Sequence, residues 1–268
     1  MSHPAKSSTV TIQVGGISVA VRTQDASFRD MLTARYTGFV IPTPHPDFEL
    51  DVELIEASAP NVDDEVQVTR QKDDWTLHRG DFRATWNART ARGKVFQAKN
   101  PYAIDSVLRI VHTLILAPQG GFLVHAASAI RNGRAFVFAG ISGAGKTTIS
   151  RLAPPDAQLL TDEVSYIRCD DGAYSACGTP FAGELARVGE NCSAPIQTLF
   201  LLAKSAENRI GSVDPADAVR ELLRHILFFA VDPEMVKLVF QSACRFVDKV
   251  PVRRLSFTPD PQVWEIIG

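Results

Sequence analysis

The sequence lacks the features that mark several protein classes. Its four cysteines are scattered along the chain and contain no CxxC pair. Disulfide scaffolds and cysteine-based zinc sites use denser or paired cysteines, so neither is expected. Basic residues are not in excess, because Lys and Arg number 28 and Asp and Glu number 30. This balance gives no indication of a nucleic-acid partner or of an anionic membrane surface.

Long hydrophobic runs are also missing. A membrane-spanning helix needs roughly 20 apolar residues, whereas the longest candidate run here covers only 226–231. The N-terminal MSHPAKSS lacks the apolar segment of a signal peptide. The chain has 268 residues, of which 45% are hydrophobic and 22% charged, close to the averages for globular proteins. We therefore expect a soluble, cytoplasmic protein with one large or two small domains.

The first hundred residues are typical of a β-rich region. Residues 9–14 and 17–23 alternate apolar and polar side chains around Gly15 and Gly16, a pattern that predicts a hairpin. Nothing in this region converges on a chemical function, and we interpret residues 1–100 as a small N-terminal domain. Further strands are expected at 48–55, 66–69, 75–77, 82–86 and 94–97, with a short helix at 28–36.

The pattern changes after Asn100, and we assign residues 101–268 to a second domain. Apolar residues at helical spacing predict a helix over 102–116, which residues 118–121 are expected to end. Asn132 and Gly133 lie between two apolar segments and predict a tight hairpin. The remaining expected elements are strands at 122–130, 134–139 and 251–257, and helices at 216–230, 233–247 and 262–267.

One motif carries most of the functional information. Residues 140–147 read GISGAGKT, a complete GxxxxGK[ST] pattern between an apolar strand and an expected helix. Glycines in such a loop let backbone N–H groups face phosphate oxygens. The lysine neutralises phosphate charge and the threonine hydroxyl suits Mg²⁺. We predict that ATP and Mg²⁺ bind at Gly140, Ser142, Gly143, Ala144, Gly145, Lys146, Thr147 and Thr148.

Two adjacent carboxylates, Asp162 and Glu163, follow a short apolar strand at 158–161. Phosphoryl transfer to a hydroxyl needs a carboxylate for Mg²⁺ and a group that accepts a proton. Because neighbouring residues at a strand end point to opposite sides, the pair can divide these tasks. The alternative interpretation is a solvated pair of acids in a loop.

His125 lies in the apolar strand that precedes the Asn132–Gly133 hairpin. The hairpin should place this strand beside the one that leads into the glycine-rich loop. The imidazole then either contacts the γ-phosphate or metal, where a titratable group is useful, or is packed in the core. The other five histidines have no comparable sequence context.

These elements together resemble the catalytic domain of the HPr kinase/phosphorylase family, whose core fold is shared with ATP-dependent phosphoenolpyruvate carboxykinase. His125–Ala126, the hairpin, the 140–147 loop and Asp162–Glu163 follow in the order typical of that family. The chain also resembles a subgroup of HPr-kinase-related serine kinases, which includes kinases of lasso-peptide precursors. That similarity is carried by GTPFAGE at 178–184, API at 194–196, and the segments 200–201, 208, 250–257 and 263–265.

The resemblance implies an α/β fold, in which a P-loop catalytic domain with a mixed sheet is joined to the β-rich N-terminal domain. It also implies residue roles, which we carry over to matching positions. For Glu184 the resemblance implies a contact with the metal or the acceptor, and the alternative is an exposed loop carboxylate. Arg187 follows in a region where the family places an arginine. The implied catalytic residues are Asp162 as general base with Lys146 and His125, and the implied metal ligands are Thr147, Glu163 and Glu184.

The sequence also departs from the HPr enzymes. They have Ser and Glu after the loop lysine, where this chain has Thr147 and Thr148. Their paired aspartates correspond to Asp162–Glu163 here, and their C-terminal segment for HPr has no counterpart. The resemblance therefore implies the nucleotide chemistry without implying HPr as the substrate.

The function favoured by these features is Mg-ATP-dependent phosphorylation of a hydroxyl, such as a Ser in a peptide or protein. A ribosomal precursor peptide of the lasso type is one such acceptor. The alternatives are a P-loop ATPase or switch that hydrolyses ATP against water, a small-molecule kinase, and a binding module without catalysis. The intact Lys146 and Asp162 argue against a binding module. Apolar stripes on the helices at 216–230 and 233–247 belong either to the core or to a homo-oligomer interface.

Overall fold

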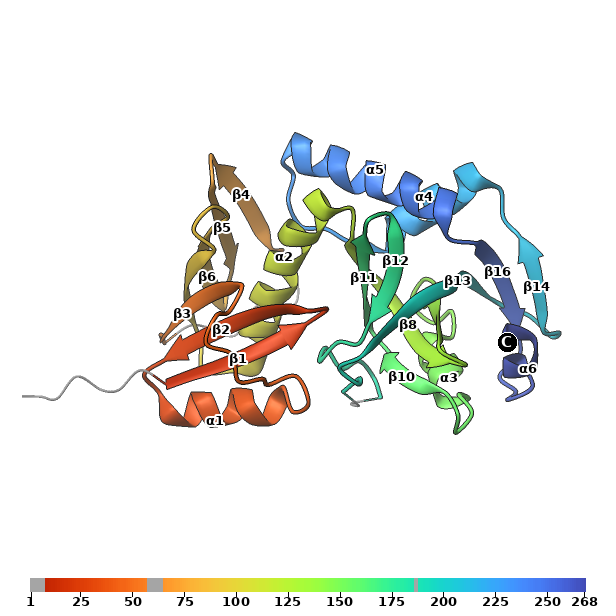
Figure 1. Ribbon diagram of the computed structural model, residues 1–268, viewed down its shortest axis with the longest axis horizontal. Helices are drawn as coiled ribbons and strands as arrows, with labels where there is room; N and C mark the ends of the chain where they lie inside the picture. The colour runs from red at the N-terminus through yellow and green to blue at the C-terminus, as the bar shows by residue number, and fades with distance from the viewer. Residues whose placement is uncertain (1–7, 57–64, 186–187) are drawn as a thin grey trace, which may run out of the picture. The chain divides into compact units, whose positions relative to one another are not determined.

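The computed structural model describes residues 8–56, 65–185 and 188–268, and it shows a mixed α/β protein (Figure 1). The chain divides into two compact units, with the boundary inside helix α2 (Pro101–Gln119). The first unit runs to His112 and also includes Phe229–Pro233. The second consists of Thr113–Phe228 and Glu234–Gly268. None of the described helices is both long and apolar enough to cross a membrane.

The first unit contains a mixed sheet of seven strands among the described residues, in the order β1-β2-β3-β7-β6-β5-β4. The predicted hairpin at Gly15–Gly16 is confirmed, because β1 and β2 pair antiparallel around it. β3 is parallel to both of its neighbours. Helix α1 (Ala26–Arg35) begins after Asp25, whose side chain accepts a hydrogen bond from the Phe28 N–H. The strands are β1 (Ser8–Val14), β2 (Ile17–Thr23), β3 (Phe48–Leu54), β4 (Gln67–Gln71), β5 (Asp74–Arg79), β6 (Phe82–Asn87) and β7 (Arg92–Gln97).

Helix α2 is longer than its apolar pattern predicts. Residues 118–121 were expected to end the helix, and this is confirmed, because Pro118 lies in its last turn and Gln119 is its last residue. Proline has no N–H to donate to the preceding turn, which favours the end of the helix at this point. Gly120 follows the last helical residue with a φ of 81°, which glycine adopts easily. The N–H of Gly121 then donates to the Leu116 carbonyl.

The second unit contains a mixed sheet of nine strands among the described residues. The predicted turn at Asn132 and Gly133 is confirmed, with φ values of 52° and 71° between paired β8 and β9. β9 and β16 lie parallel to β13 on its two sides. The strands are β8 (Phe122–Arg131), β9 (Arg134–Ala139), β10 (Gln158–Thr161), β11 (Val164–Asp170), β12 (Ala173–Cys177), β13 (Ser193–Lys204), β14 (Arg209–Ser212), β15 (Ile226–Leu227) and β16 (Val252–Phe257).

The helices of the second unit pack on both faces of this sheet. The helix expected at 216–230 is shorter, because residues 226–227 leave it and pair with β8 as β15. Side chains of β9 alternate between the two faces, with Val137 in one apolar cluster and Phe138 in the other. The helices are α3 (Lys146–Arg151), α4 (Pro215–His225), α5 (Pro233–Lys249) and α6 (Val263–Ile267).

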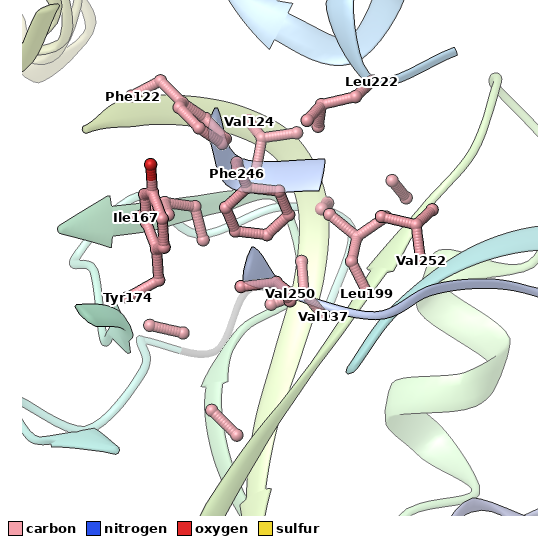
Figure 2. Close-up of a cluster of buried hydrophobic side chains, with 14 of the residues drawn as sticks. Phe122, Val124, Val137, Ile167, Tyr174, Leu199, Leu222, Phe246, Val250 and Val252 are labelled. Atoms are coloured by element: carbon pink, nitrogen blue, oxygen red, sulfur yellow. The ribbon is translucent and has the colours of Figure 1, made fainter. Parts of the chain in front are cut away.

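One cluster joins the sheet to α4 and α5 (Figure 2). Phe246 of α5 contacts Phe122 and Tyr174 edge-on, with ring centroids 5.3 and 5.0 Å away. The other cluster joins the sheet to α3 and α6, where Phe138 lies between Phe200 and Trp264. A sheet buried on both faces explains why its strands read as nearly continuous apolar runs. It also holds the loop after β9 on a rigid support.

Candidate functional site

The 140–147 loop connects the end of β9 to the start of α3. Gly143 and Gly145 have φ values of 74° and 113°, which side-chain-bearing residues rarely adopt. A Cβ atom on Gly140 would lie 2.7 Å from the Cβ of Ala144, and one on Gly145 would lie 2.7 Å from the Phe257 ring. The glycines are therefore required by the backbone path of this loop.

Several backbone donors of the loop remain available. Within the described part of the chain, the N–H groups of Gly143, Gly145, Lys146 and Thr147 have no hydrogen-bond acceptor. Unpaired N–H groups at the start of a helix favour anions. The N–H of Ala144 differs, because it donates to the Ile141 carbonyl at 3.0 Å. The loop thus presents a set of donors that suits phosphate oxygens.

Lys146 is a buried cation, with only 8% of its surface exposed. Its Nζ donates to the carbonyls of Gly140 at 2.9 Å and Ile141 at 3.4 Å. Burial lowers the pKa of this amine, while the charges of Glu163 and Glu184 act in the opposite direction. Burying a cation without a close counter-ion is costly, so this position favours an anionic ligand.

Asp162 is 2% exposed and anchors a neighbouring segment, residues 183–185. Its Oδ1 accepts the N–H of Gly183, and its Oδ2 accepts the N–H of Leu185, both at 2.9 Å. A Cβ on Gly183 would lie 2.9 Å from Asp162 Oδ2 and from Glu163. Glycine at this position allows the 183–185 segment to lie directly against the two acids.

The anchored segment reaches the loop through Glu184. The Thr147 hydroxyl donates to Glu184 Oε2 at 3.1 Å. The second member of the acid pair contacts β8, because His125 Nδ1 lies 3.4 Å from Glu163 Oε1. His125 is also the register partner of Val164, directly after Glu163. Elements far apart in sequence therefore meet at one site.

The structure thus brings His125, Lys146, Thr147, Asp162, Glu163 and Glu184 together in the second unit. Ser142 lies in the loop itself, and Thr148 lies in α3, where its carbonyl accepts the Leu152 N–H. Arg187 lies outside the described residues.

His225 belongs to the surroundings of this site, which the sequence reasoning missed. It ends α4 and is 7% exposed. β15 pairs with β8 at Ile226 and Val124, so His225 is next to His125 in the antiparallel register. Burial is the main cause that lowers the pKa of His225, and the charges of Lys146 and His125 lower it further. The continuous apolar run at 226–231, which exceeds one face of a helix, is the signal that could have indicated a change from helix to strand here.

Mg²⁺ fits the oxygen donors of the site. Thr147 and Glu184 place a hydroxyl and a carboxylate oxygen at one point beside the loop. The described residues contain no group of three or more His, Cys, Asp or Glu side chains that forms a ready metal cage. Mg²⁺ is commonly bound by one or two carboxylates together with substrate phosphates, so it does not need such a cage.

Comparison with known protein families gives one assignment. The family model described as SynChlorMet cassette protein ScmC matches residues 100–268. The chain belongs to the ScmC family. The matched residues include the 140–147 loop, the acid pair and the 183–185 segment, so the site of this ScmC family member lies within the matched region. A search of curated proteins found no match.

Proposed function

We propose that this ScmC family member is a Mg-ATP-dependent kinase with an HPr-kinase-like P-loop domain, and that it phosphorylates a hydroxyl. One observation supports the proposal most strongly. The 183–185 segment binds Asp162 through two backbone N–H groups and binds Thr147 through Glu184. The glycine-rich loop and the acid pair are therefore coupled in one polar site, as phosphoryl transfer requires.

In this proposal the loop binds the phosphates of ATP. Lys146 and the available N–H groups of Gly143 and Gly145 neutralise the phosphate oxygens. Thr147 and Glu184 would hold Mg²⁺, which would supply charge neutralisation for the phosphates. A bound triphosphate also stabilises the buried lysine, whose amine donates its hydrogen bonds to carbonyl oxygens.

The acid pair divides its work between anchoring and proton transfer. Both carboxylate oxygens of Asp162 already accept backbone N–H groups, and the side chain is almost fully buried. Glu163 is 31% exposed and lies beside His125. A general base must reach the proton that it accepts. We therefore assign the base to Glu163, with His125 positioning it, and assign Asp162 to anchoring, in place of the base that the sequence suggested.

The acceptor is proposed from its chemistry and from the family description. A carboxylate base beside the γ-phosphate site suits an alcohol such as the side chain of Ser. The family description names ScmC as a cassette protein. We propose that the acceptor is a Ser-containing peptide or protein from the same cassette.

Calorimetric titration with Mg-ATP tests the nucleotide site. We expect the wild type to bind with an affinity of roughly 1 μM to 1 mM, the usual range for enzyme substrates. Lys146→Met keeps the length of the side chain but removes its charge, so binding should be lost. Lys204→Met changes an exposed lysine of the same unit and serves as the matched control. Equal ATP affinity in both variants would contradict the assignment of this loop.

A further inference from the structure

A pocket of about 350 Å³ lies beside the site, within the second unit. A volume near the lower end of the usual range for ligand pockets suits a small, compact group. Its lining includes Ser150 and Arg151 from α3, Pro154 and Ala157 from the following turn, Leu159 from β10 and Leu185. Neither the phosphate contacts nor the proposed proton transfer uses this pocket.

Helix α3 connects the pocket to the phosphate loop. Ser150 and Arg151 are four residues beyond Lys146 and Thr147, which places them roughly 6 Å further along the helix axis. The 183–185 segment gives a second connection, because Glu184 contacts Thr147 while Leu185 lines the pocket. The pocket therefore lies roughly one helical turn from the loop residues that contact the phosphates in the proposed function.

Strand β8 gives an independent measure of the distance between the pocket and His125. Leu159 in the pocket wall is the register partner of Ala129, four residues along β8 from His125. Four strand residues span roughly 13 Å. This separation is comparable with that between the γ-phosphate and the base of an extended nucleotide. An acceptor hydroxyl must instead approach Glu163 and His125, at the other end.

The pocket walls also suit a planar aromatic group. Pro154, Ala157 and Leu185 are partly exposed apolar residues that can cover its faces. The Arg151 side chain is exposed and has no ion-pair partner within the described part of the chain. A guanidinium of this kind stacks favourably on aromatic rings.

We propose that this pocket binds the nucleobase of the nucleotide whose phosphates occupy the 140–147 loop. The inference rests on the proposed function, because it assumes that the loop binds a triphosphate. It adds a base-binding subsite formed by the end of α3, the 153–157 turn and Leu185.

Two ligands distinguish binding of the base from binding of the phosphates. Mg-ATP and Mg-tripolyphosphate are titrated into the wild type and into Ala157→Trp, whose indole would fill the pocket. We expect ATP to bind Ala157→Trp at least roughly tenfold more weakly, since tenfold corresponds to about 1.4 kcal/mol of lost base contact. Tripolyphosphate affinity should remain within about twofold. Ala206→Trp, on an exposed turn of the same unit, is the matched control.

A second variant keeps the proposal testable if a thermal melt shows that Ala157→Trp does not fold. Leu185→Ala removes one wall of the pocket but keeps the backbone N–H that binds Asp162. It should weaken ATP binding and leave tripolyphosphate binding unchanged. If the folded variants bind both ligands as tightly as the wild type does, or bind both more weakly by the same factor, the assignment of the base subsite is wrong. The assignment of the phosphate loop would be unaffected by that result. A wild type that binds neither ligand would overturn the proposed function itself.

Discussion

The two compact units each bury a charged side chain but satisfy it differently. Asp105 in the first unit is 5% exposed, and Arg35 Nε donates to its Oδ2 at 3.0 Å. Tyr36 donates to the same carboxylate. Lys146 in the second unit is nearly as buried, yet its amine contacts only two backbone carbonyls. The first charge is hydrogen-bonded to its partners within the fold, whereas the second feels Glu163 and Glu184 without an ion pair to either in the described part of the chain, and a ligand can supply a closer opposite charge.

Two buried histidines repeat this difference. His112 in the first unit packs edge-on against Phe48 with a centroid separation of 5.8 Å. Burial alone lowers the pKa of His112 to about 4. The pKa of His225 is lowered as well, but there the charges of Lys146 and His125 contribute after burial. Burial of a histidine thus does not by itself indicate a functional site. The charged groups around the histidine distinguish a functional residue from one that is packed in the core.

The largest expected effect concerns Glu163, the proposed general base in the second unit. Glu163→Gln keeps the shape of the side chain but removes its basicity. General-base catalysis contributes roughly 10²–10⁴-fold to a rate, so turnover should fall by that factor while ATP affinity changes little. Glu207→Gln, on an exposed turn, is the control. Steady-state kinetics that show less than a few-fold loss would remove Glu163 from the role of base.

The next effect concerns the paired charge of the first unit. Asp105→Ala leaves the Arg35 guanidinium and the Tyr36 hydroxyl without their acceptor. Removing one partner of a buried pair costs about 3–5 kcal/mol of unfolding free energy, which denaturant titration can measure. Asp156→Ala removes an exposed carboxylate that pairs with Arg131 and should leave the midpoint close to the wild type. Similar denaturation midpoints for both variants would contradict the claim that Asp105 is a buried charge whose partners lie within the fold.

A pH titration of stability tests the buried histidine of the first unit. The unfolded chain binds a proton at His112 near the ordinary pKa of 6.5, whereas the folded chain binds it only near 4. Unfolding therefore takes up a proton in this window, and stability falls as the pH falls from about 6.5 to 4. The shift corresponds to about 3 kcal/mol. His112→Phe retains an aromatic side chain beside Phe48 and should show a flatter profile; an unchanged slope would contradict the assignment.

The smallest of these effects tests the anchor. Asp162→Asn places an amide NH₂ where one carboxylate oxygen accepts a backbone N–H, so one of the two donors of the 183–185 segment loses its acceptor. An unsatisfied buried donor costs about 1–3 kcal/mol. Loss of the anchor should also raise the Mg²⁺ concentration needed for activity, through Glu184. A variant with wild-type stability and Mg²⁺ dependence would show that Asp162 does not act as an anchor.

Local sequence patterns predict much of the fold. Both glycine-containing hairpins are confirmed, and so is the antiparallel placement of His125 beside the strand that leads into the loop. These features depend on turn chemistry and strand alternation, which act over a few residues. The expected end of α2 within residues 118–121 is confirmed, because a proline and a positive-φ glycine there both disfavour a longer helix. The end of α4 was wrong because residues 226–227 pair with a strand a hundred residues earlier.

The site itself could be predicted only in part. The GxxxxGK[ST] pattern and the acid pair are visible in the sequence, because each is contiguous. The function of Asp162 as an anchor is not visible, since its two donors come from residues 183 and 185. The burial of His225 also depends on long-range pairing. Sequence reasoning thus located the acids without showing which of them is exposed.

The central claim is that the γ-phosphate of ATP moves to a hydroxyl, and transfer of a γ-phosphate label tests it most directly. The wild type is incubated with γ-labelled Mg-ATP, with and without a Ser-containing peptide from the same cassette and its Ser→Ala variant. We predict label on the Ser-containing peptide, none on the Ala variant, and little free phosphate without an acceptor. Steady phosphate release without an acceptor, with no label on any co-encoded peptide or protein, would contradict the account and favour an ATP hydrolase.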